Sequence, residues 1–351
     1  MRLWTLIALV GHLLIACNAL PAGADSFDLG FEHTRNYEKI GCNTYHYLLS
    51  KPSGTPKGTV VLLHGFPDLS FGWRYQIPYL TSIGYQVVAP DMLGYGRTNA
   101  PLSLRKYSLR SMSDDLVELI QRVAPNEQVI LGGHDWGGAM VYRVALWHPD
   151  VFKGIFSVCT PYFPPVTEYV DLEDQIEAGI TPTFGYQLQL RKPSTDLRLR
   201  GATKIRQMLT ALYGGRTPDG EMGFDSYTGL IWDNLPDLGP SPLVPGQLMD
   251  YYVSEYLKNT VRGPLNWYRT AKINFYEELP LTQPGKSNFT MPGLYIGATQ
   301  DTALPPEMSV GMEEYFEQGL TRGEVVSSHW ALWQAAQNVS QIIGDWASTL
   351  P

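Results

Sequence analysis

Gly133-His134-Asp135-Trp136-Gly137-Gly138 directly follows an apolar run at residues 129–131 and directly precedes a helical pattern that contains Val141 and Val144. Small residues flank the central aspartate, as a tight strand-to-helix turn requires when it pushes one side chain out at the top of a sheet. The start of a helix also favours an anion at this place. The segment therefore predicts a nucleophile elbow with Asp135 where serine is usual. Taken alone, it could also be a glycine-rich turn whose aspartate only caps the helix.

The sequence around this segment alternates between strand and helix patterns. Runs that are apolar on both faces predict strands of a sheet that is covered on both sides. Such runs occur at residues 59–63, 86–89, 129–131 and 155–158, while residues 41–49 alternate like a half-buried strand, and helical patterns lie at 111–123 and 138–147. Because this alternation is typical of parallel sheets, the predicted fold class is α/β, with a mostly parallel central sheet flanked by helices.

The alternation is interrupted after Thr160, which indicates an insertion. Prolines at 161, 164 and 165 break the pattern, and a mostly helical stretch rich in Tyr, Leu and Met continues to about Tyr268. Strand patterns return at residues 293–296 and 325–327, before a final helical pattern at 338–346. We therefore expect a core built from residues 25–160 and 270–351, with residues 161–269 inserted as a mainly helical cap.

Two polar residues near the C-terminus complete a possible catalytic set with Asp135. Asp301 follows the strand pattern at 293–296, and His329 follows the one at 325–327. Either residue alone would be ordinary in a loop. In an α/β-hydrolase, however, the chain order is nucleophile, acid and histidine, and open parallel sheets place their sites just past the C-terminal ends of the strands. The sequence therefore predicts the α/β-hydrolase fold with a triad of Asp135, Asp301 and His329.

A second loop, His64-Gly65-Phe66-Pro67, follows the strand pattern at 59–63, where this fold supplies half of its oxyanion hole. The backbone N–H groups of Phe66 and Trp136 are the expected donors. We expect His64 to have a structural role, in which it satisfies backbone groups beside the turn.

The identity of the nucleophile indicates the kind of carbon that it attacks. A serine that attacked a saturated carbon would leave an ether, which water activated by histidine does not cleave, whereas a carboxylate leaves an ester, which such water does cleave. Asp135 therefore points to a saturated carbon that bears a leaving group, such as an epoxide or a halide, and away from esterase or lipase chemistry.

Several segments together resemble the soluble epoxide hydrolase family, over nearly the whole chain after Asp25. They are His64-Gly65-Phe66-Pro67, residues 91–97 (DMLGYGR), residues 133–138, Asp301 and Ser328-His329-Trp330. In that family two cap tyrosines hold and protonate the epoxide oxygen. Residues 262–269 (RGPLNWYR) closely match the segment that carries one of them, which implies Tyr268. Residues 184–188 (FGYQL) match the other less specifically, because animal members tend to have Asp where Gly185 stands, and they imply Tyr186.

The resemblance implies a reaction that needs only a small apolar epoxide and water. Asp135 would form a covalent alkyl-enzyme ester, and His329, oriented by Asp301, would activate the water that releases a vicinal diol. We expect no organic cofactor, and the sequence contains no clustered His or Cys with the spacing of metal ligands. Fatty-acid epoxides, aryl epoxides and an epoxide intermediate of a biosynthetic pathway all suit an aromatic-rich cap.

Two other functions stay open. A dehalogenase of the same fold would use the same triad but needs donors for the halide, and Phe66 offers no side-chain donor. A haloacid would also require arginines beside Trp136, which the sequence lacks there. A silent ligand-binding protein would need neither the full triad nor the tyrosines, and it would turn over no epoxide.

Composition and the N-terminus bear on partners and location. The net charge is −8 and no Lys/Arg cluster occurs, which argues against nucleic acid as a partner. Arg2, an apolar run at 3–16 and Ala22-Gly23-Ala24 predict a signal peptide at residues 1–24 and a secreted protein, the alternative being a membrane-anchored or intracellular one. Cleavage would remove Cys17 and leave Cys42 and Cys159, whose pairing is open, and Asn288 and Asn338 lie in glycosylation sequons. The sequence does not specify an oligomeric state.

Overall fold

The computed structural model describes residues 27–351 of the chain. The expected signal peptide, residues 1–24, lies outside the described residues, and secretion stays a prediction. Within residues 27–351, no helix combines the length and the apolar character that crossing a membrane requires.

An eight-stranded sheet forms the centre of the core, in the order β1-β2-β4-β3-β5-β6-β9-β10. β2 runs antiparallel to both β1 and β4, and all the other neighbours are parallel. The central strands are the most apolar, and every residue of β3 is buried. The strands are β1 Thr34–Ile40, β2 Asn43–Ser50, β3 Thr59–Leu63, β4 Gln86–Pro90, β5 Val129–His134, β6 Phe152–Val158, β9 Gly293–Ala298 and β10 Leu320–Val325. The predicted mostly parallel α/β sheet is therefore present.

Helices cover both faces of this sheet. α2 (Leu109–Val123) and α3 (Trp136–Trp147) pack against each other, and α3 lies on β5 and β6, while α1 (Gln76–Ser82) and α12 (Ala336–Ala347) pack together near β4, β9 and β10. The Ser108 hydroxyl caps α2 by accepting a hydrogen bond from the Ser111 N–H. The two short helices next to these layers are α10 (Ala271–Glu278), which contacts α2, and α11 (Ala331–Gln334).

Two edge strands differ from the sequence prediction. The strand expected at 41–49 starts at Asn43, because Gly41 and Cys42 form the turn of a hairpin whose first strand, β1, was missed. The strand expected at 325–327 lies earlier, at Leu320–Val325, so His329 follows it after three loop residues. Both β1 and β10 are edge strands with exposed polar residues, and they therefore lack the apolar run that marks a buried strand.

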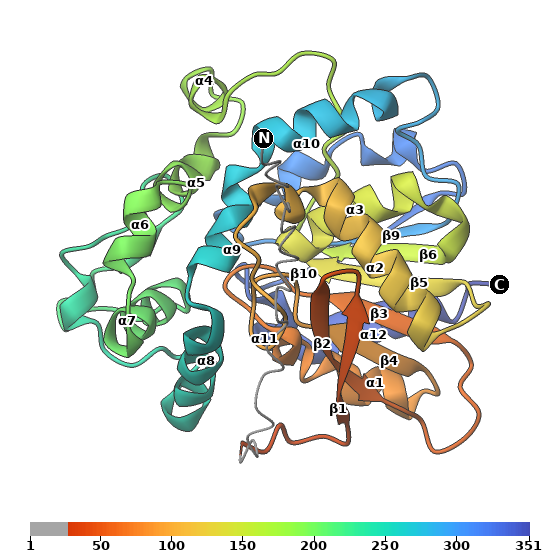
Figure 1. The fold of residues 1–351 in the computed structure, drawn as a ribbon, viewed down its shortest axis with the longest axis horizontal. Helices are drawn as coiled ribbons and strands as arrows, with labels where there is room; N and C mark the ends of the chain where they lie inside the picture. Colours follow the sequence, from red (N-terminus) through yellow and green to blue (C-terminus); the bar gives the residue numbers. More distant parts are fainter. Residues whose placement is uncertain (1–26) are drawn as a thin grey trace, which may run out of the picture.

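Most of the segment between β6 and β9, residues 161–269, forms a separate, mainly helical layer, seen at the left of Figure 1. It contains a small hairpin, β7 (Phe224–Asp225) and β8 (Gly229–Leu230). Its helices are α4 Leu172–Glu177, α5 Gly185–Leu190, α6 Pro193–Arg198, α7 Ala202–Leu212, α8 Gly246–Asn259 and α9 Arg262–Asn266. We call residues 161–269 the cap, as the sequence analysis does.

Buried polar contacts hold the cap on the core. The Arg97 guanidinium donates to both carboxylate oxygens of Glu255 in α8, at 3.1 and 2.9 Å. The indole N–H of Trp267 donates to the Leu93 carbonyl at 3.0 Å. These groups are largely removed from water, so the bonds fix the orientation of the cap more firmly than exposed ion pairs do.

The two described cysteines are both free. Cys42 is exposed in the β1–β2 turn, whereas Cys159 is buried just after β6.

Candidate active site

Asp135 occupies a strained turn between β5 and α3. Its φ is 55° and its ψ is −124°, values that L-residues rarely adopt and that the surrounding packing must impose. The packing is tight, because a Cβ added to Gly137 would lie 2.0 Å from the Leu63 carbonyl oxygen, and one added to Gly133 would lie 2.2 Å from the Gly137 carbonyl oxygen. Glycine at these positions lets β3, β5 and α3 approach closely enough to form the predicted elbow.

One oxygen of the Asp135 carboxylate is held by the backbone. The Phe66 N–H donates to Asp135 Oδ1 at 2.7 Å, and the Trp136 N–H is a second backbone donor to this carboxylate. A Cβ on Gly65 would lie 2.2 Å from Oδ1, so this loop reaches the carboxylate only because residue 65 is glycine. The two expected oxyanion donors therefore converge on the carboxylate of Asp135 itself.

His329 lies between the two carboxylates of the predicted triad. Its Nδ1 is 2.7 Å from Asp301 Oδ2, and its Nε2 is 3.6 Å from Asp135 Oδ2. The other oxygen of Asp301 accepts hydrogen bonds from the N–H groups of Ala303 and Leu304, both at 2.9 Å. The structure thus brings together all three residues that the sequence placed in order along the chain.

The two carboxylates dominate the protonation of His329. Burial alone would lower the pKa of the imidazole, but the negative charges of Asp301 and Asp135 and the hydrogen bond to Asp301 raise that pKa to about 9. The pKa of Asp301 is lowered, because the His329 charge and the backbone donors outweigh its burial. Burial raises the pKa of Asp135, although His329 and the two N–H groups oppose the rise. At neutral pH His329 is therefore an imidazolium that is hydrogen-bonded to the ionised Asp301.

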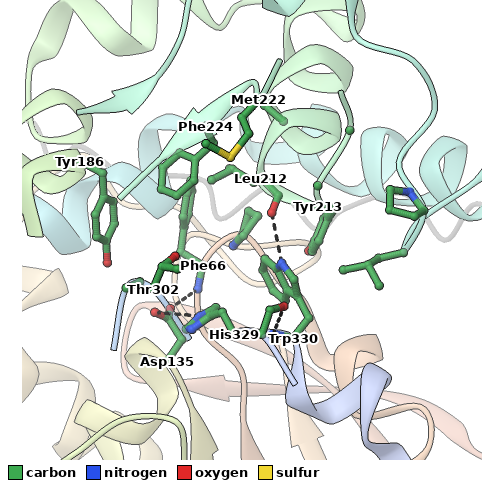
Figure 2. Close-up of a pocket in the computed structure, with 18 of the residues that line it drawn as sticks. Phe66, Asp135, Tyr186, Leu212, Tyr213, Met222, Phe224, Thr302, His329 and Trp330 are labelled. Atoms are coloured by element: carbon green, nitrogen blue, oxygen red, sulfur yellow. Dashed lines mark hydrogen bonds and ion pairs between the residues drawn. The ribbon is translucent and has the colours of Figure 1, made fainter. Parts of the chain in front are cut away.

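A cavity of about 370 Å³ opens above Asp135, between the core and the cap. Tyr186 and Tyr268 both line it, and their ring centroids lie 6.1 Å apart. Figure 2 shows the Tyr186 hydroxyl directed toward the side of the cavity where Asp135 and His329 lie. Burial raises the pKa of both phenols above the ordinary value, so both keep their protons at neutral pH. The two predicted tyrosines therefore share one cavity with Asp135, and each carries a proton that it can donate.

His64 and Asp68 lie on either side of Phe66 in the chain, and both are buried. His64 Nε2 accepts from the Met92 N–H at 2.9 Å, and Nδ1 lies 2.9 Å from the Gly65 carbonyl oxygen, the structural role expected of this histidine. Burial lowers its pKa to about 4, so it is neutral. Asp68, which the sequence analysis did not select, is buried nearby and accepts from the Tyr252 hydroxyl at 2.7 Å. Burial raises the pKa of Asp68 to about 6.

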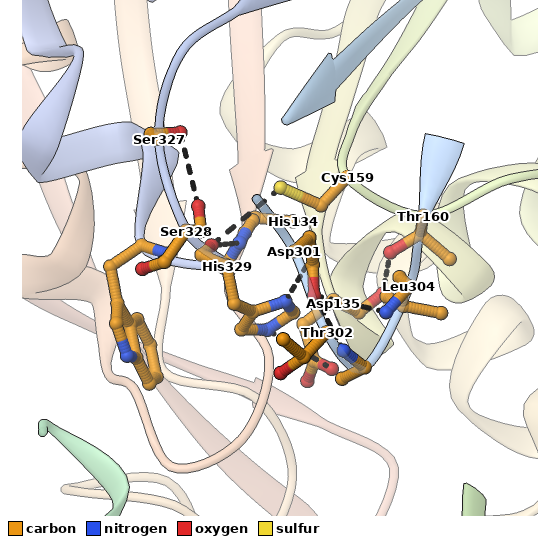
Figure 3. Close-up of polar contacts among 12 residues, drawn as sticks. His134, Asp135, Cys159, Thr160, Asp301, Thr302, Leu304, Ser327, Ser328 and His329 are labelled. Atoms are coloured by element: carbon orange, nitrogen blue, oxygen red, sulfur yellow. Dashed lines mark hydrogen bonds and ion pairs between the residues drawn. The ribbon is translucent and has the colours of Figure 1, made fainter. Parts of the chain in front are cut away.

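A second polar cluster behind the triad was also missed by the sequence analysis. His134 Nε2 lies 2.8 Å from the main-chain carbonyl oxygen of His329, and Cys159 Sγ lies 3.6 Å from the same oxygen (Figure 3). His134, Cys159 and His329 offer ligand atoms within 4.8 Å of one another, the spacing of a metal site. Because the His134 Nε2 and His329 Nδ1 atoms already take part in hydrogen bonds, we interpret this group as a hydrogen-bond cluster.

The comparison with known proteins agrees with this geometry. The sequence profile of the α/β-hydrolase fold family matches residues 58–336. The chain is 45% identical over 314 residues to epoxide hydrolase srdG of Neurospora crassa. This alignment covers 86% of this chain and 91% of that protein. It is 32% identical to epoxide hydrolase A of Mycobacterium tuberculosis, over 72% of this chain and 78% of that protein.

The chain belongs to the epoxide hydrolase family of the α/β-hydrolase fold. It is also 30% identical to bifunctional epoxide hydrolase 2 of the rat, where the match covers 83% of this chain but 51% of that longer protein. Among solved structures, a mutant Vigna radiata epoxide hydrolase superposes with a TM-score of 0.73 at 27% identity, over 91% of this chain and 99% of that one. The resemblance that the motifs implied is thus confirmed at the level of the family.

Only part of this epoxide hydrolase site could be read from sequence motifs. The contacts of Asp68, His134 and Cys159 join segments that lie far apart in the chain. The contact between His134 and His329, for example, joins residues 195 positions apart. In the sequence, the sign of this contact was the histidine directly before Asp135. A histidine at this position does not itself indicate which loop its side chain contacts.

The charge balance of this site predicts the titration of His329. We expect the wild-type imidazole to titrate near pH 9, and its pKa to fall in the Asp135→Asn variant, because one of the two carboxylates that favour the charged ring is lost. NMR titration of ¹⁵N-labelled histidine, assigned with His329→Gln, measures both values. Asp250→Asn, at an exposed site on α8, is the control and should leave the His329 pKa unchanged. A wild-type pKa at or below that of free histidine would contradict this electrostatic assignment.

Proposed function

We propose that the protein adds water to an epoxide and releases a vicinal diol, through a covalent alkyl-enzyme ester on Asp135. The observation that carries the proposal is the position of this carboxylate at the nucleophile elbow. The Phe66 N–H holds its Oδ1, while Oδ2 faces His329 beneath the cavity that both cap tyrosines line. The epoxide hydrolase names of the relatives support the same reaction.

In the first half of the reaction, Asp135 Oδ2 attacks one epoxide carbon and the ring C–O bond breaks. Tyr186 and Tyr268 donate hydrogen bonds to the ring oxygen, and one of them supplies the proton that turns the developing alkoxide into a hydroxyl group. Oδ1 remains as the carbonyl oxygen of the new ester, and the Phe66 N–H already donates to it. The oxyanion hole is therefore occupied by the correct atom before the second half begins.

The ester also changes the charge beside His329. Asp135 becomes neutral, so the His329 pKa falls and the ring can release its proton. Ring opening consumes one proton and His329 loses one, so the phenol can be restored without net proton uptake from solvent. The neutral imidazole is then the general base that the second half needs.

In the second half, His329 removes a proton from water, and the water oxygen adds to the carboxyl carbon of Asp135. Negative charge develops on Oδ1 and is stabilised by the two N–H groups. The C–O bond to the diol breaks, and the diol oxygen takes one of the two water protons. The other proton stays on His329, next to the restored Asp135 carboxylate, which regenerates the resting charge state.

The ester itself provides the direct test. In a single turnover in heavy-oxygen water with enzyme in excess, the diol should be unlabelled and the label should appear in the peptide that contains residues 133–138. His329→Gln should stall with the added mass of one substrate molecule, because ester hydrolysis lacks its base. Asp135→Ala is the control and should gain neither mass nor label. A labelled diol in the first turnover, with an unlabelled peptide, would mean that water attacks the epoxide directly.

The roles proposed for Tyr186 and Tyr268 lead to a second prediction, which concerns the first half-reaction alone. Tyr268→Phe should slow ester formation about a hundredfold, the typical loss when one oxyanion donor is removed, and adding Tyr186→Phe should nearly abolish it. Stopped-flow kinetics of ester formation measure these rates. Tyr213→Phe is the matched control, since this tyrosine also lines the cavity but has no role in the mechanism, and its effect should be much smaller. An unchanged rate of ester formation in Tyr268→Phe would contradict the assignment of that donor.

A further inference from the structure

The lining of the cavity carries one charged side chain that the reaction does not use. Most of the wall is apolar, and six aromatic side chains dominate it: Phe66, Tyr186, Tyr213, Phe224, Tyr268 and Trp330. The charged lining residues are Asp135, His329 and Arg216. A single charge in an apolar pocket commonly fixes the orientation of a ligand that carries the opposite charge.

Arg216 is held in place but retains free donors. It lies in the loop between α7 and β7 and is exposed, so it lines the cavity where the cavity reaches solvent. Its carbonyl accepts from the Gly239 N–H at 2.8 Å, and its Nη1 donates to the Gly220 carbonyl at 2.8 Å. No ion pair with Arg216 occurs in residues 27–351, and Nε and Nη2 make no hydrogen bond there. The Nε–Nη2 edge can therefore donate two parallel bonds to a carboxylate.

We propose that the substrate is an epoxide whose apolar body ends in a carboxylate, and that Arg216 binds this carboxylate while Asp135 attacks the epoxide. The inference rests on the proposed epoxide hydrolysis and adds the chemical class of the substrate. The aromatic wall takes the apolar body, while Arg216 and Asp135 engage the two functional groups of the substrate and so set its orientation. The enzyme would then select substrates by the distance between their epoxide and their carboxylate.

Matched pairs of substrates test this proposal. The probes are terminal-epoxide carboxylic acids of increasing chain length, each compared with its methyl ester. The wild type should prefer the acid about tenfold in kcat/KM, as expected for one charge-assisted contact, with a maximum at one chain length. Arg216→Gln should abolish this preference, and Arg216→Lys should retain part of it, because a lysine keeps the charge but loses the paired donors.

A control variant and two kinds of contrary result distinguish the carboxylate site from the broader proposal of epoxide hydrolysis. Arg200→Gln removes an equal charge from an exposed cap position outside the cavity lining, and it should preserve the acid preference. Equal kcat/KM for acids and esters in the wild type, or an equal loss of preference in both variants, would overturn the carboxylate site. Failure to hydrolyse any acid or ester would instead refute the proposed function.

A separate observation concerns the loop that carries His329. The His134 side chain is buried, and burial together with the nearby His329 charge lowers its pKa to about 3, so the ring is neutral. A carbonyl oxygen can only accept, so the proton of this ring must lie on Nε2, which donates to the His329 carbonyl at 2.8 Å. The residue before the nucleophile thus holds the main chain of the catalytic histidine.

We infer that His134 is a positioning residue for His329. Its bond ties the elbow to the His329 loop, and Cys159 approaches the same carbonyl from β6. Without this bond the imidazole can shift relative to both carboxylates, and small displacements of a catalytic group cost large factors in rate. Because His329 acts as a base only on the ester, the proposed mechanism predicts that the second half-reaction suffers most.

Comparing the two half-reactions tests this role. His134→Leu should slow ester hydrolysis about tenfold more than ester formation, so that the ester accumulates during steady turnover, whereas His134→Gln, which keeps an N–H donor, should recover most of the loss. Tyr85→Phe is the control, since it removes a buried bond to the Ala347 carbonyl far from the site and should not change the ratio of the two rates. Equal slowing of both steps in His134→Leu, or no recovery in a folded His134→Gln, would overturn the positioning role.

Discussion

The hydrogen bond from the Phe66 N–H to Asp135 Oδ1 depends on a close approach of two backbone segments. Residue 65 must lack a Cβ for the loop after β3 to reach the carboxylate, and residue 137 must lack one for α3 to start beside Leu63. The positive φ of Asp135 then turns the side chain to the edge of the sheet. The position of the Asp135 carboxylate and of the N–H group that holds it is thus a product of backbone packing, and the surrounding side chains adjust the charge of this carboxylate.

That packing also determines the charge balance of the site. Asp135 and Asp301 both lie beside His329 in a largely buried space, where charges interact more strongly than in water. The negative charges of both carboxylates raise the pKa of the shared imidazole to about 9, so His329 is protonated at neutral pH. Formation of an ester on Asp135 would remove one of the two charges and convert the same histidine from an acid into a base. One bond change can therefore prepare the second step without any movement of the backbone.

The sequence predicted the buried centre of the fold better than its edges. β3 is apolar along its whole length and was located with its correct bounds, whereas β1 and β10 are exposed polar strands without a periodic signal. In the site, chain order located Asp135, Asp301 and His329, because the fold fixes which loops carry them. The contacts of Asp68 and His134 depend on how distant segments meet, and Arg216 stands out only when the cavity wall is known, so local patterns could not identify them.

The cap does more than cover the cavity, because it also binds the loops that carry Phe66 and His329. The hydroxyls of Tyr252 and Tyr256 in α8 donate to Asp68 and to the Pro67 carbonyl, both at 2.7 Å, directly after the oxyanion donor Phe66. On the other side, the Trp330 indole donates to the Leu212 carbonyl of α7 at 3.1 Å, directly after His329 (Figure 2). A displacement of the cap would therefore move the phenols that line the cavity together with the loops that flank Asp135 and His329. In the proposed mechanism, substitutions that change the position of the cap on the core should consequently affect both half-reactions, whereas substitutions confined to the cavity wall should change the choice of substrate.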